Sequence, residues 1–373
     1  MLTRRQFIKA SSTAAIAAGG GLMAGGALAG CGGGQSSSGK GVVNVLTWGD
    51  PQKAKLMGEA FKEETGITLN LVPGLDDADF WNKVRYGGKG TYDTVVTNIG
   101  YLPLYKKAGL IEVLNLSDFP SSDELYSQYR TDMRFPYLLA PDRALCFPDQ
   151  WGLYGMTFSK ISSFKVTQPY SWEALWKAPK GAVMLDGAPV VNMALTARMT
   201  GIPWDRVFSI NGAELNTVVQ RLRELKPFQI PTSTNAKIAD FRTKVTDVGL
   251  VFSLGFGNQV GDKVAQSVVP VEGALGALDG QVLLKGAPNR ANALKWINFL
   301  GGKRAQVIFW DLYQGPTVNK AATDAIIARG GTQAALIKAQ SGDKPDICAA
   351  MTEVRQPDNP SAWNLAWDRV QAA

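Results

Sequence analysis

The chain has 373 residues, a formal net charge of +7 and an apolar content of 45%, which is ordinary for a globular protein. It contains no histidine, and this excludes catalytic and metal sites that depend on an imidazole. No C-x-x-C or cofactor motif occurs, and no basic run or basic–aromatic pattern indicates binding to nucleic acid. Chemistry carried by carboxylates alone remains open, although no motif supports it.

Two export signals follow one another at the start of the chain. Residues 3–9 form a twin-arginine motif around Arg4 and Arg5, and a weakly apolar stretch rich in Ala and Gly follows. Residues 28–31, Leu-Ala-Gly-Cys, match the cleavage site of a bacterial lipoprotein. A transmembrane helix is the alternative, but glycines interrupt this run, which lacks the ~20 apolar residues needed. We therefore expect residues 1–31 to direct twin-arginine export to the periplasm, with lipid on Cys31.

The remaining chain begins with a flexible segment. Residues 32–41 are mostly Gly and Ser, a composition typical of a linker. About 340 residues remain after the cleavage site, which suits two lobes or domains rather than one core. No later stretch approaches the length of a membrane span, so the lipid would be the only membrane attachment.

Strands and helices alternate along the body of the chain, which predicts an α/β fold with mostly parallel sheets flanked by helices. The expected strands are residues 42–48, 67–72, 92–97, 151–159, 182–185 and 249–253. The expected helices are residues 52–64, 77–86, 102–108, 172–176, 190–199, 213–225, 289–300, 303–313 and 321–328.

Two cysteines besides Cys31 remain, Cys146 and Cys348. An even pair in an oxidising compartment is compatible with a disulfide. Two separately buried thiols are the alternative, and the sequence leaves both open.

Several segments, in the same order along the chain, resemble bacterial extracellular solute-binding proteins, and in particular their spermidine/putrescine-binding branch. The first is the helix-to-strand junction Ala60-Phe61-Lys62-Glu63-Glu64-Thr65-Gly66-Ile67. The others are residues 92–96, 109–111, 171–176, 193–195, 270–273, 293–300 and 315–322.

The resemblance implies a two-lobed periplasmic binding protein fold with a ligand cleft between the lobes. Residues 42–148 and 279–308 would form lobe 1, and residues 149–278 and 309–373 would form lobe 2. Hinge closure would trap an amine ligand, and the closed monomer would deliver it to the permease subunits of an ABC transporter. The implied protein is a carrier without catalytic activity or cofactor.

A polyamine site needs aromatic walls for its methylenes and carboxylates for its ammonium groups. The resemblance and the loops after strands give these candidate ligand-binding residues: Trp48, Asp50, Asn98, Tyr101, Asp149, Trp151, Asp186, Phe252 and Asp279. Structural roles are the alternatives for Trp48 in the core, for Asp50 as a helix cap and for the crossing at residues 149–151.

Three positions depart from the family pattern. Val190 stands where the polyamine binders have a glutamate, Ala277 where they have a tryptophan, and Gly100 where they have a ligand-stacking tyrosine. Asp186 could replace some of the missing charge. A shorter or singly charged amine is therefore open as the ligand.

Two other functions remain as alternatives. One is a secreted hydrolase that uses paired carboxylates, for which Asp149, Asp186 and Glu272 are candidates. The other is a ligand-sensing lipoprotein without a transporter.

Overall fold

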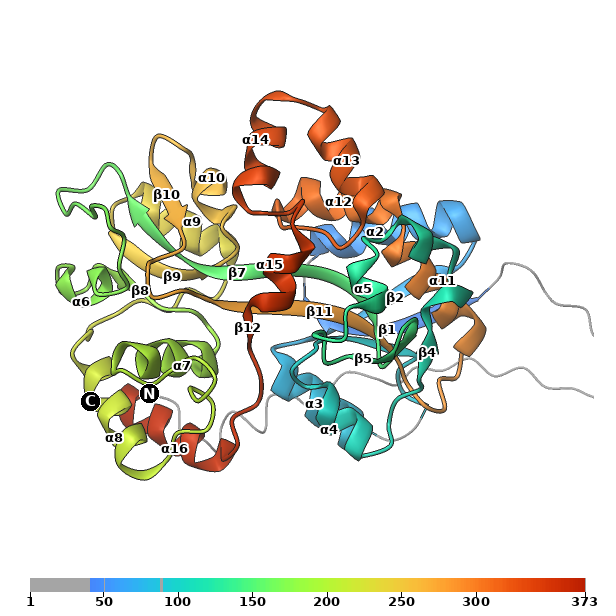
Figure 1. The fold of residues 1–373 in the computed structure, drawn as a ribbon, viewed down its shortest axis with the longest axis horizontal. Helices are drawn as coiled ribbons and strands as arrows, with labels where there is room; N and C mark the ends of the chain where they lie inside the picture. The colour runs from blue at the N-terminus through green and yellow to red at the C-terminus, as the bar shows by residue number, and fades with distance from the viewer. Residues whose placement is uncertain (1–40, 50, 88–89, 373) are drawn as a thin grey trace, which may run out of the picture. The chain divides into compact units, whose positions relative to one another are not determined.

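The computed structural model describes residues 41–49, 51–87 and 90–372 (Figure 1). The twin-arginine motif, the lipidation residue Cys31, residues 32–40 of the linker and Asp50 lie outside the described residues. Among the described helices, none combines the length and the apolar character needed to cross a bilayer.

One large mixed sheet runs through the described fold, in the strand order β2-β1-β3-β11-β7-β9-β8, with β10 paired to β7 and β12 paired to β11. Its strands are β1 (Val42–Trp48), β2 (Thr68–Gly74), β3 (Thr94–Asn98), β7 (Phe147–Ser159), β8 (Val183–Met184), β9 (Val248–Phe252), β10 (Ala265–Val268), β11 (Leu275–Leu283) and β12 (Thr352–Glu353). A second, small sheet has the order β4-β6-β5, from β4 (Leu114–Asn115), β5 (Leu138–Ala140) and β6 (Arg143–Ala144).

The predicted parallel pairing holds at the two ends of the large sheet. Strand β1 is parallel to β2 and β3, and β8 is parallel to β9. The two long central strands differ, because β11 runs antiparallel to both β3 and β7, and β7 runs antiparallel to β9. The α/β class is thus confirmed, with a mixed sheet.

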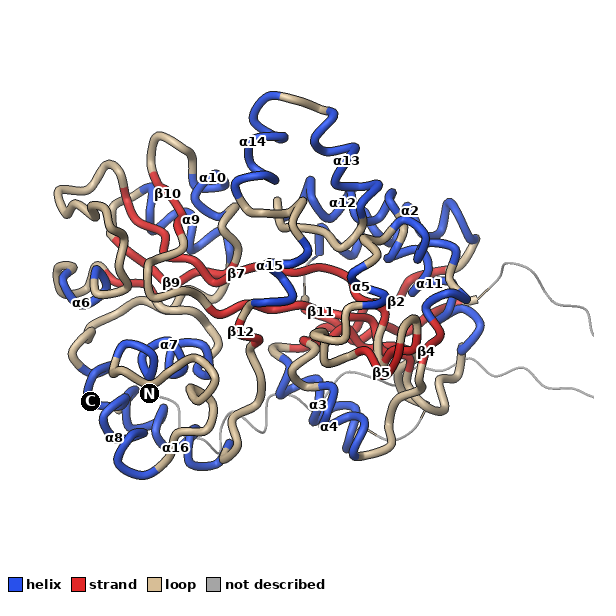
Figure 2. Tube along the Cα trace, viewed as in Figure 1, coloured by secondary structure: helices blue, strands red, loops and turns tan. Residues whose placement is uncertain are grey.

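Helices lie on both sides of the large sheet (Figure 2). They are α2 (Pro51–Thr65), α3 (Asp77–Tyr86), α4 (Leu102–Lys107), α5 (Gln128–Thr131), α6 (Ala174–Lys177), α7 (Pro189–Met199), α8 (Gly212–Arg223), α9 (Thr234–Arg242), α10 (Phe256–Val260), α11 (Arg290–Gly301), α12 (Lys303–Tyr313), α13 (Lys320–Ala328), α14 (Gly331–Ala339), α15 (Pro345–Ala350) and α16 (Pro360–Gln371), with 3-10 turns η1 (Leu116–Asp118) and η2 (Pro120–Glu124).

Local chemistry explains several helix ends. The side chain of Asp76 accepts a hydrogen bond from Asp79 N and caps α3, and Asn319 caps α13 in the same way through Ala322 N. Both are residue types that satisfy free N–H groups at helix starts. Gly66 follows α2 with a φ of 72°, the left-handed conformation that ends many helices, as predicted.

Two main hydrophobic cores are buried in the described part of the chain. The first contains Phe61, Trp296 and other residues from β1, α2, β3 and α11, and the second contains Trp172, Trp363 and other residues from α6, α7, α8 and α16. Strands β7 and β11 contribute residues to both. The boundaries proposed for the two lobes stay a prediction.

The chain passes between these cores a third time near its C-terminus. Cys348 of α15 belongs to the first core, whereas Val354, six residues later, belongs to the second. We call residues 351–355 the C-terminal strap. The strap lies against two glycines: a Cβ atom on Gly100 would lie 2.1 Å from Val354 O, and one on Gly276 would lie 2.1 Å from Met351 Sδ.

The disulfide that the cysteine count allowed is absent from the structure, in which Cys146 and Cys348 are free, buried thiols. Each sulfur has a separate packing role. Cys146 lies against Gly280 of β11, where an added Cβ would approach its sulfur to 2.4 Å, and Cys348 lies beside the Tyr129 side chain. In the structure the two cysteines are therefore separate buried thiols, which is the alternative to a disulfide given above.

Gly100→Ala should destabilise the fold, because its new methyl group would meet backbone atoms of the strap rather than a side chain that can move aside. We expect a loss of about 1–3 kcal/mol, the usual cost of overpacking, measured by urea denaturation. Gly187→Ala is the matched control, since nothing lies within 4 Å of its Cβ position. Equal stability of the two variants would contradict the close approach of the strap.

Candidate functional site

The carboxyl ends of the strands carry most of the predicted site residues. Trp48 and Asn98 end β1 and β3, which are parallel, and Phe252 ends β9. Asp186 lies two residues beyond β8, which is parallel to β9. Ligands in α/β proteins bind at this edge of the sheet, so the structure places these four residues where the loop argument expects a site.

Strand β11 brings three polar side chains into one row across the sheet. Asp279 of β11 faces Asn98 of β3 on one side and Gln150 of β7 on the other. Gln150 Nε2 donates to Asp279 Oδ2 over 3.1 Å. All three residues are buried, with exposed fractions of 2–8%. Asn98 and Asp279, which are far apart in the sequence, are therefore neighbours.

The C-terminal strap adds a carboxylate to this row that the sequence analysis missed. Glu353 Oε1 accepts hydrogen bonds from Asn98 Nδ2 at 2.6 Å and from Leu278 N at 3.0 Å. Strand β12 has only two residues, which is too short for a periodic pattern, so no sequence signal indicated Glu353.

A second missed carboxylate, Asp77, lies on the other side of Asn98. Asp77 Oδ1 accepts hydrogen bonds from Thr97 Oγ1 at 2.7 Å and from Asn98 N at 2.8 Å. Asp77 starts α3, soon after the carboxyl end of β2. The rule that selected the loops after β1 and β3 could therefore have selected Asp77 as well.

The surroundings of both missed carboxylates, Asp77 and Glu353, disfavour the negatively charged form. Burial raises the pKa of Asp77 to about 6, against hydrogen bonds that lower it. Burial also raises the pKa of Glu353 well above its usual range, and the charges of Asp279 and Asp77 raise it further. The described residues form no ion pair with Asp77 or Glu353.

Two aromatic side chains lie on the neighbouring strands β7 and β9. The rings of Tyr154 and Phe252 meet edge to face, with their centroids 5.0 Å apart. Burial raises the pKa of Tyr154, and the nearby charges of Asp186, Asp279, Asp77 and Glu353 raise it further. Tyr154, which the sequence analysis did not select, thus lies within electrostatic range of the acids on both sides.

Two other predicted aromatic residues lie nearby but are largely committed to packing. Tyr101 is 6% exposed and precedes α4, and burial followed by the charge of Asp77 raises its pKa. Trp48 is partly buried and packs edge to face on Phe80, with centroids 5.1 Å apart. This contact fits the alternative that Trp48 is a core residue rather than a ligand-binding one.

The structure gives Asp149 and Trp151 different surroundings from the row. The carboxylate of Asp149 accepts hydrogen bonds from Gln281 Nε2 at 3.3 Å and Gln306 Nε2 at 2.8 Å. Trp151 is 2% exposed and belongs to the first core. Its Nε1 is buried and has no hydrogen-bond partner among the described residues. Hydrogen bonds thus account for Asp149 and core packing for Trp151, although this indole N–H remains available.

The three acids suggested for a hydrolase do not form a catalytic pair. Asp186 pairs with Lys237 at 3.4 Å, and Asp149 has the amide partners given above. Glu272 accepts hydrogen bonds from Ser171 Oγ and from Trp172 N. Each carboxylate is therefore engaged in a separate network. Among the described residues, no three His, Cys, Asp or Glu side chains are placed to hold a metal ion.

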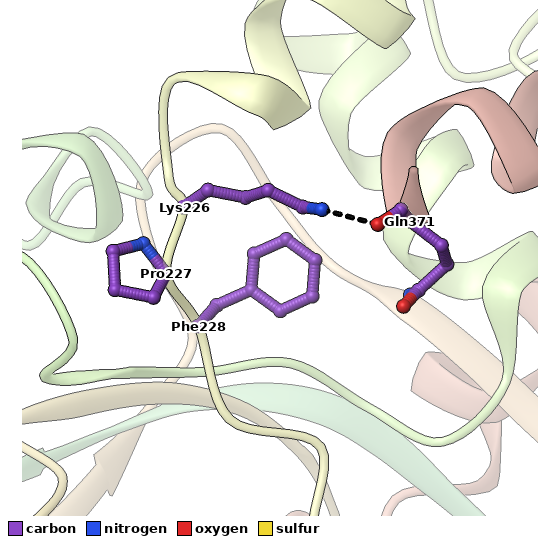
Figure 3. Close-up of a pocket in the computed structure, with 4 residues that line it drawn as sticks. All are labelled: Lys226, Pro227, Phe228 and Gln371. Atoms are coloured by element: carbon purple, nitrogen blue, oxygen red, sulfur yellow. Dashed lines mark hydrogen bonds between the residues drawn. The ribbon is translucent and has the colours of Figure 1, made fainter. Parts of the chain in front are cut away.

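Two surface hollows lie away from these residues. One, of about 420 Å³, is lined by Lys226, Pro227, Phe228 and Gln371, and Lys226 Nζ donates to Gln371 O over 2.6 Å (Figure 3). The other, of about 410 Å³, is lined by Leu56, Glu59, Ala60, Glu63, Arg304, Ile308 and Asp311. Neither includes a predicted site residue. We define the candidate site by its side chains: Asp77, Asn98, Gln150, Tyr154, Phe252, Asp279 and Glu353.

This arrangement favours binding of a cation over chemistry. The charge of Asp77 raises the pKa of Glu353, Asn98 donates a hydrogen bond to each acid, and the described residues form no ion pair with either. An ammonium group would relieve that repulsion, and an aromatic ring face would favour it as well.

Comparison with known proteins gives the family. The model of the bacterial extracellular solute-binding proteins matches residues 57–336. The spermidine/putrescine-binding periplasmic protein of Escherichia coli is 26% identical over 250 residues, covering 65% of this chain and 68% of the relative. The putrescine-binding periplasmic protein SpuD of Pseudomonas aeruginosa is 24% identical over 303 residues, covering 76% and 80%.

A solved structure shows the same fold. The Tp0655 (TpPotD) lipoprotein of Treponema pallidum superposes with a TM-score of 0.70 at 18% identity, covering 88% of this chain and 99% of that one. The two-lobed periplasmic binding protein fold is therefore confirmed. The chain belongs to the bacterial extracellular solute-binding protein family, whose members bind small molecules for transport.

Proposed function

We propose that this protein is the substrate-binding lipoprotein of an ABC importer and that it captures an organic amine, with spermidine and putrescine as the first candidates. The observation that carries the proposal is the pair of partly buried carboxylates, Asp77 and Glu353, which have no described cationic partner. The names of the relatives support the same ligand class. Lobe closure would trap the ligand, and a membrane permease would receive it.

The energetics favour a cationic ligand. Burying a carboxylate costs free energy unless a positive charge or several hydrogen bonds compensate it. Here Asn98 supplies one hydrogen bond to each acid, through its backbone N to Asp77 and through its side chain to Glu353. An amine would add the missing positive charge, whereas a neutral sugar would leave the repulsion unrelieved.

Two features should limit the affinity for a full polyamine. Val190 and Ala277 replace a carboxylate and an aromatic wall of the polyamine-binding branch, and Ala277 is 7% exposed in β11. Losing one charge-assisted contact at a desolvated site costs about 1.5–3 kcal/mol. We therefore expect spermidine to bind roughly tenfold to a hundredfold more weakly than at a complete site.

Calorimetric titration of the ligand-free protein tests the ligand class. Putrescine and spermidine should bind, and a panel of neutral sugars should not. Glu353→Gln and Asp279→Asn should each weaken amine binding by about tenfold or more, since each removes one charge-assisted contact. Glu59→Gln, on the exposed side of α2, is the control for loss of one charge.

Sugar binding without amine binding would refute the proposed ligand class. Amine binding that Glu353→Gln and Asp279→Asn leave unchanged would retain the class but refute the site.

The raised pKa of Asp77 should make the stability of the protein depend on pH. Because the folded-state pKa of Asp77 is about 6 and its ordinary value is 3.8, the folded protein binds more protons than the unfolded chain between these values. The ligand-free protein should therefore become more stable as the pH falls from 7 to about 4.5. A shift of this size corresponds to about 3 kcal/mol, which we reduce to about 1–2 kcal/mol for partial exposure.

Urea denaturation at a series of pH values measures this contribution. Asp77→Asn should flatten the slope, and Glu59→Gln, at an exposed position of α2, is the control for loss of one carboxyl group outside the hydrogen bonds of Asp77. A stability that rises from pH 4.5 to 7 equally in the wild type and in Asp77→Asn would contradict the prediction.

Export is tested separately, because its signals lie outside the described residues. Cys31→Ala should release the exported protein from the membrane fraction, because the thiol that takes the lipid is gone. Replacing Arg4 and Arg5 with lysine should block export, because the twin-arginine receptor reads both residues. Cell fractionation measures both. A Cys31→Ala protein that stays membrane-bound would refute lipid anchoring.

A further inference from the structure

Among the described residues, one ion pair is more enclosed than the others, and it lies at the end of β8. Lys237 Nζ of α9 lies 3.4 Å from Asp186 Oδ2, and the two side chains are 17% and 10% exposed. The other ion pairs of the described residues each have at least one side chain exposed by 30% or more. Enclosing two charges costs free energy even when they pair, so the position of this partly buried Lys237 is worth explaining.

The pair belongs to the same edge of the sheet as the candidate site. The register Met184↔Gly249 of the parallel strands β8 and β9 places Asp186 near the level of Phe252. Phe252 in turn faces Tyr154 of β7. Gln150, which bonds Asp279, lies four residues earlier in β7, about 13 Å along the strand. The site thus has one end at Asp279 and the other at Asp186.

The carboxylate of Asp186 is already occupied on both oxygens. Its Oδ1 accepts a hydrogen bond from Ala188 N at 2.9 Å, and its Oδ2 faces Lys237. Val190, the second residue of α7, adds no charge. The Asp186 end is therefore electrically neutral, whereas the opposite end carries Asp77 and Glu353 without a described cation.

We propose that Lys237 is a specificity-determining residue that rejects a second ammonium group at the Asp186 end. The preferred ligand then carries one ammonium group, held at the Asp77–Glu353 end, and an anionic or neutral acceptor that faces Lys237. This ligand class is an ω-amino acid rather than a diamine. The inference rests on the proposed function, because it assumes that an amine occupies the site.

Charge matching between the ligand and the Asp186 end would produce this selectivity. A second ammonium could use Asp186 only by displacing Lys237 or by lying beside it, and like charges at such distances repel. A carboxylate at the same position would gain a cationic donor and leave the Asp186 contact to α7 intact. Specificity commonly arises from such a repulsive element in a site.

Three ligands with the same four-carbon chain isolate this effect: putrescine, 1-butylamine and 4-aminobutyrate. They share an ammonium group on three methylenes and differ only at the fourth carbon, which carries an ammonium in putrescine, is a methyl in 1-butylamine and is a carboxylate in 4-aminobutyrate. In calorimetric titrations of the wild-type protein, 4-aminobutyrate should bind at least tenfold more tightly than putrescine.

The Lys237→Met variant should reverse this order. Putrescine should gain at least tenfold in affinity, 4-aminobutyrate should lose at least tenfold, and 1-butylamine should change less than threefold. Lys263→Met, at an exposed position between α10 and β10, is the matched control and should leave the affinities for all three ligands unchanged. Asp186→Asn should act in the opposite direction, because it leaves the charge of Lys237 unopposed. We expect it to strengthen the binding of 4-aminobutyrate and to weaken the binding of putrescine further.

The outcomes separate this inference from the proposed function. If putrescine binds the wild type most tightly and neither variant at the pair changes the order, the inference is overturned and amine capture stands. If none of the three ligands nor spermidine binds, amine capture itself is refuted and the inference falls with it. Should Lys237→Met fail to fold, the Asp186→Asn titrations decide alone.

Discussion

The pairing of β11 with β3 on one side and β7 on the other is the constraint on which the site depends. It places Asp279 between Asn98 and Gln150, and it carries the backbone N–H of Leu278 that holds Glu353. Since β7 and β11 contribute to both hydrophobic cores, any change in their register would alter the packing of both cores and the site together. Gly276 and Gly280 let the strap and Cys146 approach the strand closely.

Asp77 and Glu353 differ from the interior acid Asp149 in having another acid close by. Asp149 accepts hydrogen bonds from two glutamine side chains. Asn98 donates a hydrogen bond to both Asp77 and Glu353, and the charge of Asp77 raises the pKa of Glu353. The strap brings these two acids together, because it places a residue from the end of the chain beside β3, where Gly100 leaves room for it.

Much of the local structure could be predicted from the sequence. The strand at residues 42–48 and the helix at residues 77–86 have the expected bounds. The strand is a short, mostly apolar run, and the buried Phe80 and Val84 of the helix are four residues apart, as one helix face requires. Strand β11 was not predicted as an element: Gly276 and Gly280 lower its strand propensity, although it is wholly buried. Asp279 was therefore placed by family resemblance alone.

Only part of the candidate site could be predicted from the sequence. Asn98 and Asp186 follow recognisable strands, and the loop rule selects them, whereas Phe252 was placed by the family resemblance. Glu353 depends on a strap that pairs with β11 from more than 70 residues away, and no local pattern encodes such a contact. The ion pair between Lys237 and Asp186 likewise joins a helix to a distant strand end.

The central claim is that cation binding relieves the repulsion between buried carboxylates. Calorimetric titration of putrescine at pH 6, in two buffers that differ in ionisation enthalpy, tests it most directly, because the difference in heat counts the protons released. Acids with raised pKa values lose protons when a cation binds beside them, so the account predicts net proton release, absent when Asp77 and Glu353 are replaced by Asn and Gln. Binding without proton release, or with uptake, would contradict it.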